Sequence, residues 1–347
     1  MSSTRIPFVD GIGAQERALA RVEQAVDDAL DRLDPVLLAA RRPTFLAMGA
    51  SYAALAATVT DLRRDGVAAV RELASESTGA PGADLVVAVS QGGRSAETLA
   101  ALDGLDVPTV GLVNVVGSPL EERTDAVVGL GGELDSYAST VGLTATLVAL
   151  ERLGARLVGG RPSPWGGVGE HVASVVAAAT DVLGPFAARC VAGAVSSADV
   201  VAAGRSVTTA EATALLLREV VRLPTTAAVT RNYLHGAMES AGATLHVVVG
   251  DGREVPLART LAGAGHLTLL VTTQDVAAEG ALEVVRLPGT TPAQRTVLEV
   301  VALQVLAREL AAAADVDIEA FVFANHDTKA GGVDPGDFAV ASPDLGA

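Results

Sequence analysis

DLVVAVSQGGRSAETLAALDG, residues 84–104, contains the transition that decides the fold: an apolar run, a short polar loop and an amphipathic segment. The run has the length of a buried strand, and the residues after the loop have the composition of a helix. Further strands are predicted at 67–75 and 108–115, and a strand followed by a loop at 44–51 and at 126–135. Further helices are predicted at 14–40, 52–66 and 139–157. This alternation is typical of a parallel sheet covered by helices on both faces.

The same order of elements occurs a second time, about 155 to 160 residues later. DVVAAGRS at 199–206 repeats TFLAMGAS at 44–51, and TLHVVVGDGREVPLARTLAGAG at 244–265 repeats the stretch quoted first. An offset of this size indicates duplication of a whole domain. We therefore predict an α/β protein with two doubly wound parallel-sheet subdomains, each a flavodoxin-like three-layer sandwich.

The predicted domain boundaries follow from this duplication. Residues 1–34 form an N-terminal helical segment, and 35–160 form the first subdomain. The Pro- and Gly-rich segment RPSPWGGVGEH begins a linker at 161–178. The second subdomain then covers 179–320, and 321–347 form a C-terminal tail.

The composition limits the kinds of partner. The chain has 347 residues and a net charge of −16, which argues against binding nucleic acid or an anionic membrane. No run of eighteen apolar residues lacks polar interruption, so we expect no transmembrane helix. The N-terminus lacks the apolar region of a secretory signal, and the single cysteine, Cys190, excludes an intrachain disulfide. These features favour a cytoplasmic protein.

The loop SQGGRS at 90–95 has the composition of an anion-binding loop. In a doubly wound sheet, ligands bind beyond the carboxyl ends of the strands, where the first amides of helices lack partners. The loop supplies two hydroxyls, from Ser90 and Ser95, and a third comes from Ser51, in the loop that follows the strand within 44–51. Gln91 supplies an amide, and Gly92 permits close approach of a ligand to the backbone.

Two observations qualify this interpretation. Ser95 is followed by Glu97 and Thr98, so helix N-capping explains that serine equally well. The second copy of the loop, GDGRE at 250–254, lacks the two serines, so the anion site is expected in the first copy alone.

Five motifs, in order and spacing, resemble the double sugar isomerase (SIS) domain family over residues 35 to 330: MGASYAAL, AVSQGGRSAET, NVVGSPLEERTD, ELDSYASTVGLTATL and LREVVRLPTTAAVTRNYLHG. The family includes the isomerase half of glutamine–fructose-6-phosphate amidotransferase and the fructosamine-6-phosphate deglycases. The resemblance implies a phosphosugar site at the carboxyl edge of the first sheet. It assigns to the phosphate and the sugar these residues: Ser51, Ser90, Gln91, Gly92, Ser95, Ala138 and Ser139.

The resemblance also implies catalytic residues. Glu219 lies in an apolar helical segment, sixteen positions before His235, and this separation matches the family's catalytic Glu and ring-opening His. Partial burial would raise the pKa of the Glu219 carboxyl, as a base near neutral pH requires. The alternative is an ion pair of Glu219 with Arg218 or Arg222 on the helix surface. In related enzymes this His comes from the neighbouring subunit, which implies a homodimer with shared active sites.

The sequence also departs from the family pattern. Gly92 replaces a serine and Arg94 replaces a glutamate of the family's loop, and the Arg94 guanidinium could substitute for the lost hydroxyl. Leu216 stands where the amination enzymes have a lysine. Lys329 is the expected equivalent of the family's C-terminal lysine, which can form a Schiff base with the sugar carbonyl.

We expect an enzyme that acts on a sugar phosphate or amino-sugar phosphate by moving a proton between C1 and C2, as in aldose–ketose isomerisation. A deglycase or deaminase that releases an amine is the first alternative, and a non-catalytic phosphosugar-binding module is the second. The chain starts with the SIS region and has no glutaminase domain, so glutamine-dependent amidotransfer is not expected. No cofactor and no metal are expected, because the acidic residues and histidine of the tail fit no ligand spacing.

Overall fold

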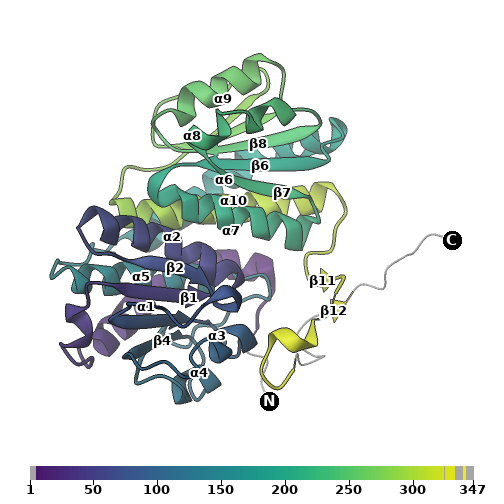
Figure 1. Cartoon of the computed structure of the whole chain (residues 1–347). Helices are drawn as coiled ribbons and strands as arrows, with labels where there is room; N and C mark the ends of the chain where they lie inside the picture. The colour runs from purple at the N-terminus through teal and green to yellow at the C-terminus, as the bar shows by residue number, and fades with distance from the viewer. Residues whose placement is uncertain (1–4, 324, 333–338, 341–347) are drawn as a thin grey trace. The chain divides into compact units, whose positions relative to one another are not determined.

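The computed structural model describes residues 5–323, 325–332 and 339–340 of the chain. It divides into two compact units (Figure 1), one formed by Met1–Trp165 with Glu319–Ala347 and the other by Gly166–Ile318. Each unit contains one five-stranded sheet. The C-terminal segment therefore belongs with the first unit, although the whole second unit precedes it in the chain.

All strands of the first sheet are parallel, in the order β2-β1-β3-β4-β5. The central strands are apolar and buried along their whole length, because helices cover both faces of the sheet. Its strands are β1 (Pro43–Ala47), β2 (Val70–Leu73), β3 (Leu85–Val89), β4 (Thr109–Val113) and β5 (Ala126–Gly129). Its helices are α1 (Phe8–Leu30), α2 (Gly49–Arg64), α3 (Ala96–Ala100), α4 (Pro119–Glu122) and α5 (Val141–Leu157), with short turns η1 (Leu37–Ala39), η2 (Ala74–Glu76) and η6 (His326–Thr328).

The second sheet repeats this topology, because its parallel strands have the order β10-β9-β8-β6-β7. Its strands are β6 (Ser197–Ala202), β7 (Thr225–Val229), β8 (Thr244–Val249), β9 (Thr268–Thr272) and β10 (Leu282–Arg286). Its helices are α6 (Val168–Ala192), α7 (Val207–Leu216), the π-helical turn η4 (Leu217–Val221), α8 (Thr230–Tyr233), α9 (Glu254–Gly263) and α10 (Pro292–Ala313), with short turns η3 (Gly204–Ser206) and η5 (Ala237–Ser240). The predicted duplicated α/β fold is confirmed.

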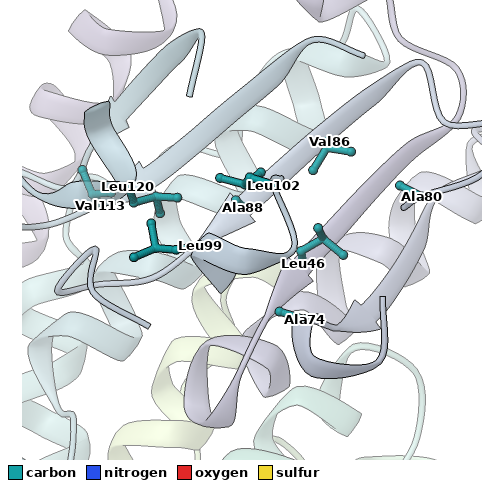
Figure 2. Packing of buried hydrophobic residues seen from close by; sticks show 9 residues of the cluster. All are labelled: Leu46, Ala74, Ala80, Val86, Ala88, Leu99, Leu102, Val113 and Leu120. Carbon is teal, nitrogen blue, oxygen red and sulfur yellow. The ribbon is translucent and has the colours of Figure 1, made fainter. Parts of the chain in front are cut away.

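Helix α3 is held to the first sheet by a cluster of buried apolar side chains. Leu99 and Leu102 project from α3 and the turn after it toward Leu46 of β1 and Ala88 of β3 (Figure 2). Leu120 of α4 belongs to the same cluster and is fully buried. This packing fixes the start of α3, and with it the loop that connects β3 to α3.

The structure differs from the sequence-based expectation at two helices. The N-terminal helix ends at Leu30 rather than near residue 40. The long helix α6 begins at Val168, inside the range 161–178 that was expected to be a linker. Among the described helices, α6 is long and apolar enough to span a membrane by length and composition. It packs along α10 and buries Val172, Leu183 and Phe186, and 33% of its most apolar window is buried inside the protein.

Candidate functional site

The loops that follow β1 and β3 lie side by side at the carboxyl edge of the first sheet, because Ala47 pairs with Val89 in parallel register. This is the point where the strand order reverses, with β2 on one side of β1 and β3 on the other. Ligands of doubly wound sheets bind in the crevice at such a switch point. Half-buried Ser51 lies in the first turn of α2, and Gly49 before it has a left-handed φ of 53°.

The loop after β3 is braced by main-chain hydrogen bonds. The amide of Ser90 donates to the carbonyl of Leu112 (3.1 Å), and that of Gly93 donates to the carbonyl of Ser90 (2.9 Å). The amide of Leu120 in turn donates to the carbonyl of Gly93 (3.0 Å). The backbone of this loop, which we call the anion loop (residues 90–95), is therefore fixed by strand β4 and helix α4.

Ser118 is a residue of this site that sequence reasoning did not assign. It is 3% exposed, and its buried Oγ has no hydrogen-bond partner. A Cβ added to Gly93, which has a φ of 61°, would lie 2.1 Å from that Oγ. A buried hydroxyl without a partner is costly, and this one lies directly against the backbone of the anion loop. Its position in the NVVGSPLEERTD motif was the available sequence signal.

Ser95 caps helix α3. Its Oγ accepts hydrogen bonds from the amide of Thr98 (3.5 Å) and the hydroxyl of Thr98 (3.0 Å), and it donates to Glu97 (3.1 Å). Ser95 is therefore an N-cap residue of α3 in this structure. Ser90 accepts from the amide of Ser95 at 3.4 Å, which closes the loop upon itself. Gly92 is exposed and has open space at its Cα.

Gln91 and Ser139 meet at the predicted sugar side of the loop. The Ser139 hydroxyl is within 3.1 Å of Gln91 Oε1 and donates to Asp135 at 2.6 Å. A side chain on Gly142 would collide with both the Gln91 amide and the Asp135 carboxylate. Ala138 is 4% exposed, and its carbonyl accepts from Ser136, so its side chain belongs to the core. The structure therefore brings Gln91 and Ser139 together and adds Asp135, which was not predicted.

The C-terminal segment lies against the anion loop. Lys329 forms an antiparallel bridge with Ser95, and the amide of Ala330 donates to the carbonyl of Arg94 (2.8 Å). The Arg94 guanidinium donates to the carbonyls of Ala330 and Gly332. The expectation that this guanidinium replaces a phosphate-binding hydroxyl is therefore not supported, because it binds main-chain carbonyls.

Glu219 lies in the π-helical turn η4 that ends α7. The turn buries Leu217 and Val220 on either side of the half-buried Glu219. Single π-helical turns are rare, and they are frequent at functional sites. The Arg218 guanidinium donates to the carbonyl of Thr225 (2.8 Å), which ties this arginine to the start of β7.

The structure does not bring His235 and Glu219 together within one chain. His235 is exposed and follows α8, which covers the same sheet face as α9 and contributes Tyr233 to its core (Figure 1). Glu219 follows α7, which packs against α10 on the opposite face. The helices that precede the two residues therefore lie on opposite faces of the second sheet.

The second unit has its own polar cluster at the carboxyl edge of its sheet, which we call the acidic corner. Asp251, after β8, accepts from the hydroxyl of Thr272 (2.6 Å), the amide of Thr273 (2.9 Å) and the Arg295 guanidinium. Burial alone would raise the pKa of the Asp251 carboxyl, but these hydrogen bonds outweigh it and lower that pKa to about 2. Glu299 is fully buried and binds Arg295 at 2.8 Å, and burial raises the pKa of its carboxyl. The carboxylates of the protein itself thus occupy this corner.

Within residues 5–323, 325–332 and 339–340, no group of three His, Cys, Asp or Glu side chains is arranged to hold a metal ion. His326 and Asp327 lie in the short turn η6. Asp334 lies outside the described residues.

No protein-family model and no curated protein sequence matches this chain. The C-terminal domain of glucosamine-fructose-6-phosphate aminotransferase from Francisella tularensis matches 90% of this chain over 97% of its own length, with a TM-score of 0.75 and 20% identity. Tagatose-6-phosphate ketose/aldose isomerase from Escherichia coli matches 88% of this chain over 92% of its own length, with a TM-score of 0.70 and 15% identity. Glucosamine-6-phosphate deaminase from Thermotoga maritima matches 88% over 94%, with a TM-score of 0.66 and 16% identity. These whole-length likenesses show that the chain has the duplicated α/β fold of the sugar isomerase (SIS) domain proteins.

Proposed function

We propose that this protein is an enzyme that interconverts the aldose and ketose forms of a sugar phosphate or amino-sugar phosphate. The observation that carries the proposal is the polar cluster at the switch point of the first sheet. There the anion loop offers Ser90 and Gln91, α2 offers Ser51, and Ser118 offers a buried hydroxyl without a partner. Hydroxyl, amide and main-chain N–H donors in a rigid loop suit a phosphate group.

Glu219 is the proposed base, which removes the proton at C2 and returns it to C1 through an enediol. Its half-buried position in a π-helical turn supports this role, because such turns are frequent at functional sites. His235 is the proposed ring-opening residue. Since the helices that precede it and Glu219 lie on opposite faces of the second sheet in one chain, its proposed substrate is that of the neighbouring subunit in a homodimer. Lys329 is the proposed amine near the sugar carbonyl.

Glu219→Gln tests the base. The variant should lower kcat at least about 1,000-fold while the Kd for D-fructose 6-phosphate stays within about tenfold, because only the proton acceptor is removed. Glu211→Gln, a half-buried glutamate on the same helix, serves as the matched control and should keep kcat within about threefold. A loss of binding by Glu219→Gln with unchanged folding would instead assign Glu219 to ligand binding or structure.

A mixture of Glu219→Gln and His235→Ala chains tests the shared site. Neither variant should be active alone, whereas co-refolded chains should regain about a quarter of the wild-type activity, since half of the dimers then hold one intact site. Complementation would fail if both residues served the same subunit's substrate.

A deaminase or deglycase is the second candidate, and its support is the fold shared with glucosamine-6-phosphate deaminase. Release of ammonia from glucosamine 6-phosphate, or of an amine from a fructosamine 6-phosphate, would favour it over aldose–ketose exchange. Binding of these sugars without turnover would favour a phosphosugar-binding module.

A further inference from the structure

Arg94 joins the anion loop to the C-terminal segment. Its Nε and Nη2 atoms donate to the Ala330 carbonyl at 3.0 and 2.7 Å, and Nη2 also donates to the Gly332 carbonyl at 2.8 Å. The return bond runs from the Ala330 amide to the Arg94 carbonyl at 2.8 Å. Ala330 also packs against the apolar cluster under α3. One side chain and one short strand bridge thus fix residues 329–332 to the loop.

Lys329 lies inside this clamp, in the antiparallel bridge with Ser95. It is the single lysine of the 347-residue chain, which carries 24 of its 25 basic side chains as arginine. Its amine is therefore the one lysine amine that could condense with a carbonyl. Two further contacts lead the segment to this place: the Glu319 carboxylate accepts from the Phe8 amide (2.7 Å), and the Phe321 ring contacts the Tyr137 ring at 4.2 Å.

We propose that Arg94 is a positioning residue: it holds residues 329–332 on the anion loop and thereby fixes Lys329 beside the bound anion. The part of this inference that concerns catalysis rests on the proposed function, whereas the clamp itself does not. A guanidinium that donates to two carbonyls is well suited to this role, because its planar fork forms several hydrogen bonds from one fixed orientation. The glutamate expected at this position from the family pattern has no donor for these carbonyls.

Cleavage by an endoprotease specific for lysine tests the clamp directly, since Lys329 is its single target in the chain. Paired backbone resists cleavage, so Arg94→Ala should raise the cleavage rate at least about tenfold. Arg94→Lys keeps the charge and can bind one carbonyl, so its cleavage rate should lie between the rates of Arg94→Ala and the wild type. Arg123→Ala, which removes an exposed arginine paired with Asp103, is the matched control and should be cleaved at the wild-type rate.

Steady-state kinetics with D-fructose 6-phosphate tests the positioning role. Arg94→Ala should lower kcat about tenfold or more with KM within about threefold. The reason is that Arg94 binds main-chain carbonyls and so orders Lys329, but does not hold the phosphate. A raised KM with unchanged kcat would make Arg94 an anion ligand and overturn the proposal, as would an unchanged cleavage rate. Faster cleavage with wild-type kcat would overturn the positioning of Lys329. A wild-type protein without turnover would defeat the proposed function and the catalytic part, while the cleavage rates would still decide the clamp.

Discussion

The two units place different chemistry at the same corner of the same fold. In both, the helical element after the first strand of the unit begins with a glycine of left-handed φ, 53° at Gly49 and 60° at Gly204, and a serine follows two residues later. In the first unit this serine is Ser51, beside the anion loop. In the second it is Ser206, whose hydroxyl donates to the buried Glu299 carboxylate at 2.9 Å.

The loops after the third strand differ in the same way. The anion loop presents serines, an amide and an exposed glycine, and a buried hydroxyl faces its backbone. The loop after β8 instead carries Asp251, which Thr272, Thr273 and Arg295 hold in place. In the second copy this corner is filled by a carboxylate that hydrogen bonds of the protein itself hold in place. The two units therefore share their topology and differ in the polar groups at this corner.

Among substitutions that test this difference between the units, the largest loss of stability is expected at the acidic corner. Asp251→Ala should lower the free energy of unfolding by about 2 to 3 kcal/mol, because Arg295 and two threonine donors lose their acceptor. Urea titration measures this change. Asp275→Ala removes an exposed carboxylate paired with Arg286 and should change stability by less than about 0.5 kcal/mol. Equal losses in both variants would show that the acidic corner is not a structural substitute for a ligand.

The anion loop should depend on its glycines unequally. Gly93→Ala should cost about 2 kcal/mol, because the residue has a φ of 61° and its new Cβ would lie 2.1 Å from Ser118 Oγ. Gly92→Ala should cost less than about 0.5 kcal/mol, since its Cα faces open space. Thermal unfolding of the two variants compares them. Similar losses would mean that the tight contact with Ser118 does not shape the loop.

A serine added to the loop after the third strand should change the affinity for phosphate in the first unit and not in the second. Gly92→Ser restores a hydroxyl where the family pattern has one, and it should tighten binding of inorganic phosphate about three- to tenfold by one added hydrogen bond. Gly252→Ser, the matched change in the loop after β8, should leave the affinity unchanged. Isothermal titration measures both. Tighter binding by the Gly252 variant would place an anion site in the second copy.

Lowering the pH should slightly reduce the stability that the acidic corner contributes. The Asp251 carboxyl has a pKa lowered to about 2 against an ordinary value of 3.8, so the stability that it contributes is complete well above 3.8 and is lost as pH falls toward 2. Between pH 6 and pH 4 this loss amounts to about 0.3 kcal/mol. The difference in urea stability between the wild type and Asp251→Asn should shrink by this amount over that interval. A difference that grows as the pH falls would contradict the sign.

Local patterns of the sequence predicted the strands, their order in two halves and the loops that end them, because buried parallel strands are apolar runs of recognisable length. The motifs assigned Gln91 and Ser139 separately to the phosphate and the sugar, and the contact between them was not predicted. Ser118 and Asp135 were missed, because their importance depends on contacts with residues distant in sequence. The contacts of Arg94 were not predicted for the same reason: nothing near position 94 reveals that residues 330 and 332 fold back upon it.

The return of the C-terminal segment to the first unit has a consequence for biosynthesis. The Phe8 amide and the Arg94 guanidinium find their acceptors in residues 319–332, which the ribosome makes after the entire second unit. The first sheet can form early in translation, since all of its strands precede residue 130. The segment that binds beside this sheet, residues 319–332, is however synthesised last. Nascent chains would therefore hold a folded first sheet well before residues 319–332 bind Phe8 and Arg94, and a chain that ends at residue 318 would keep the sheet without these contacts.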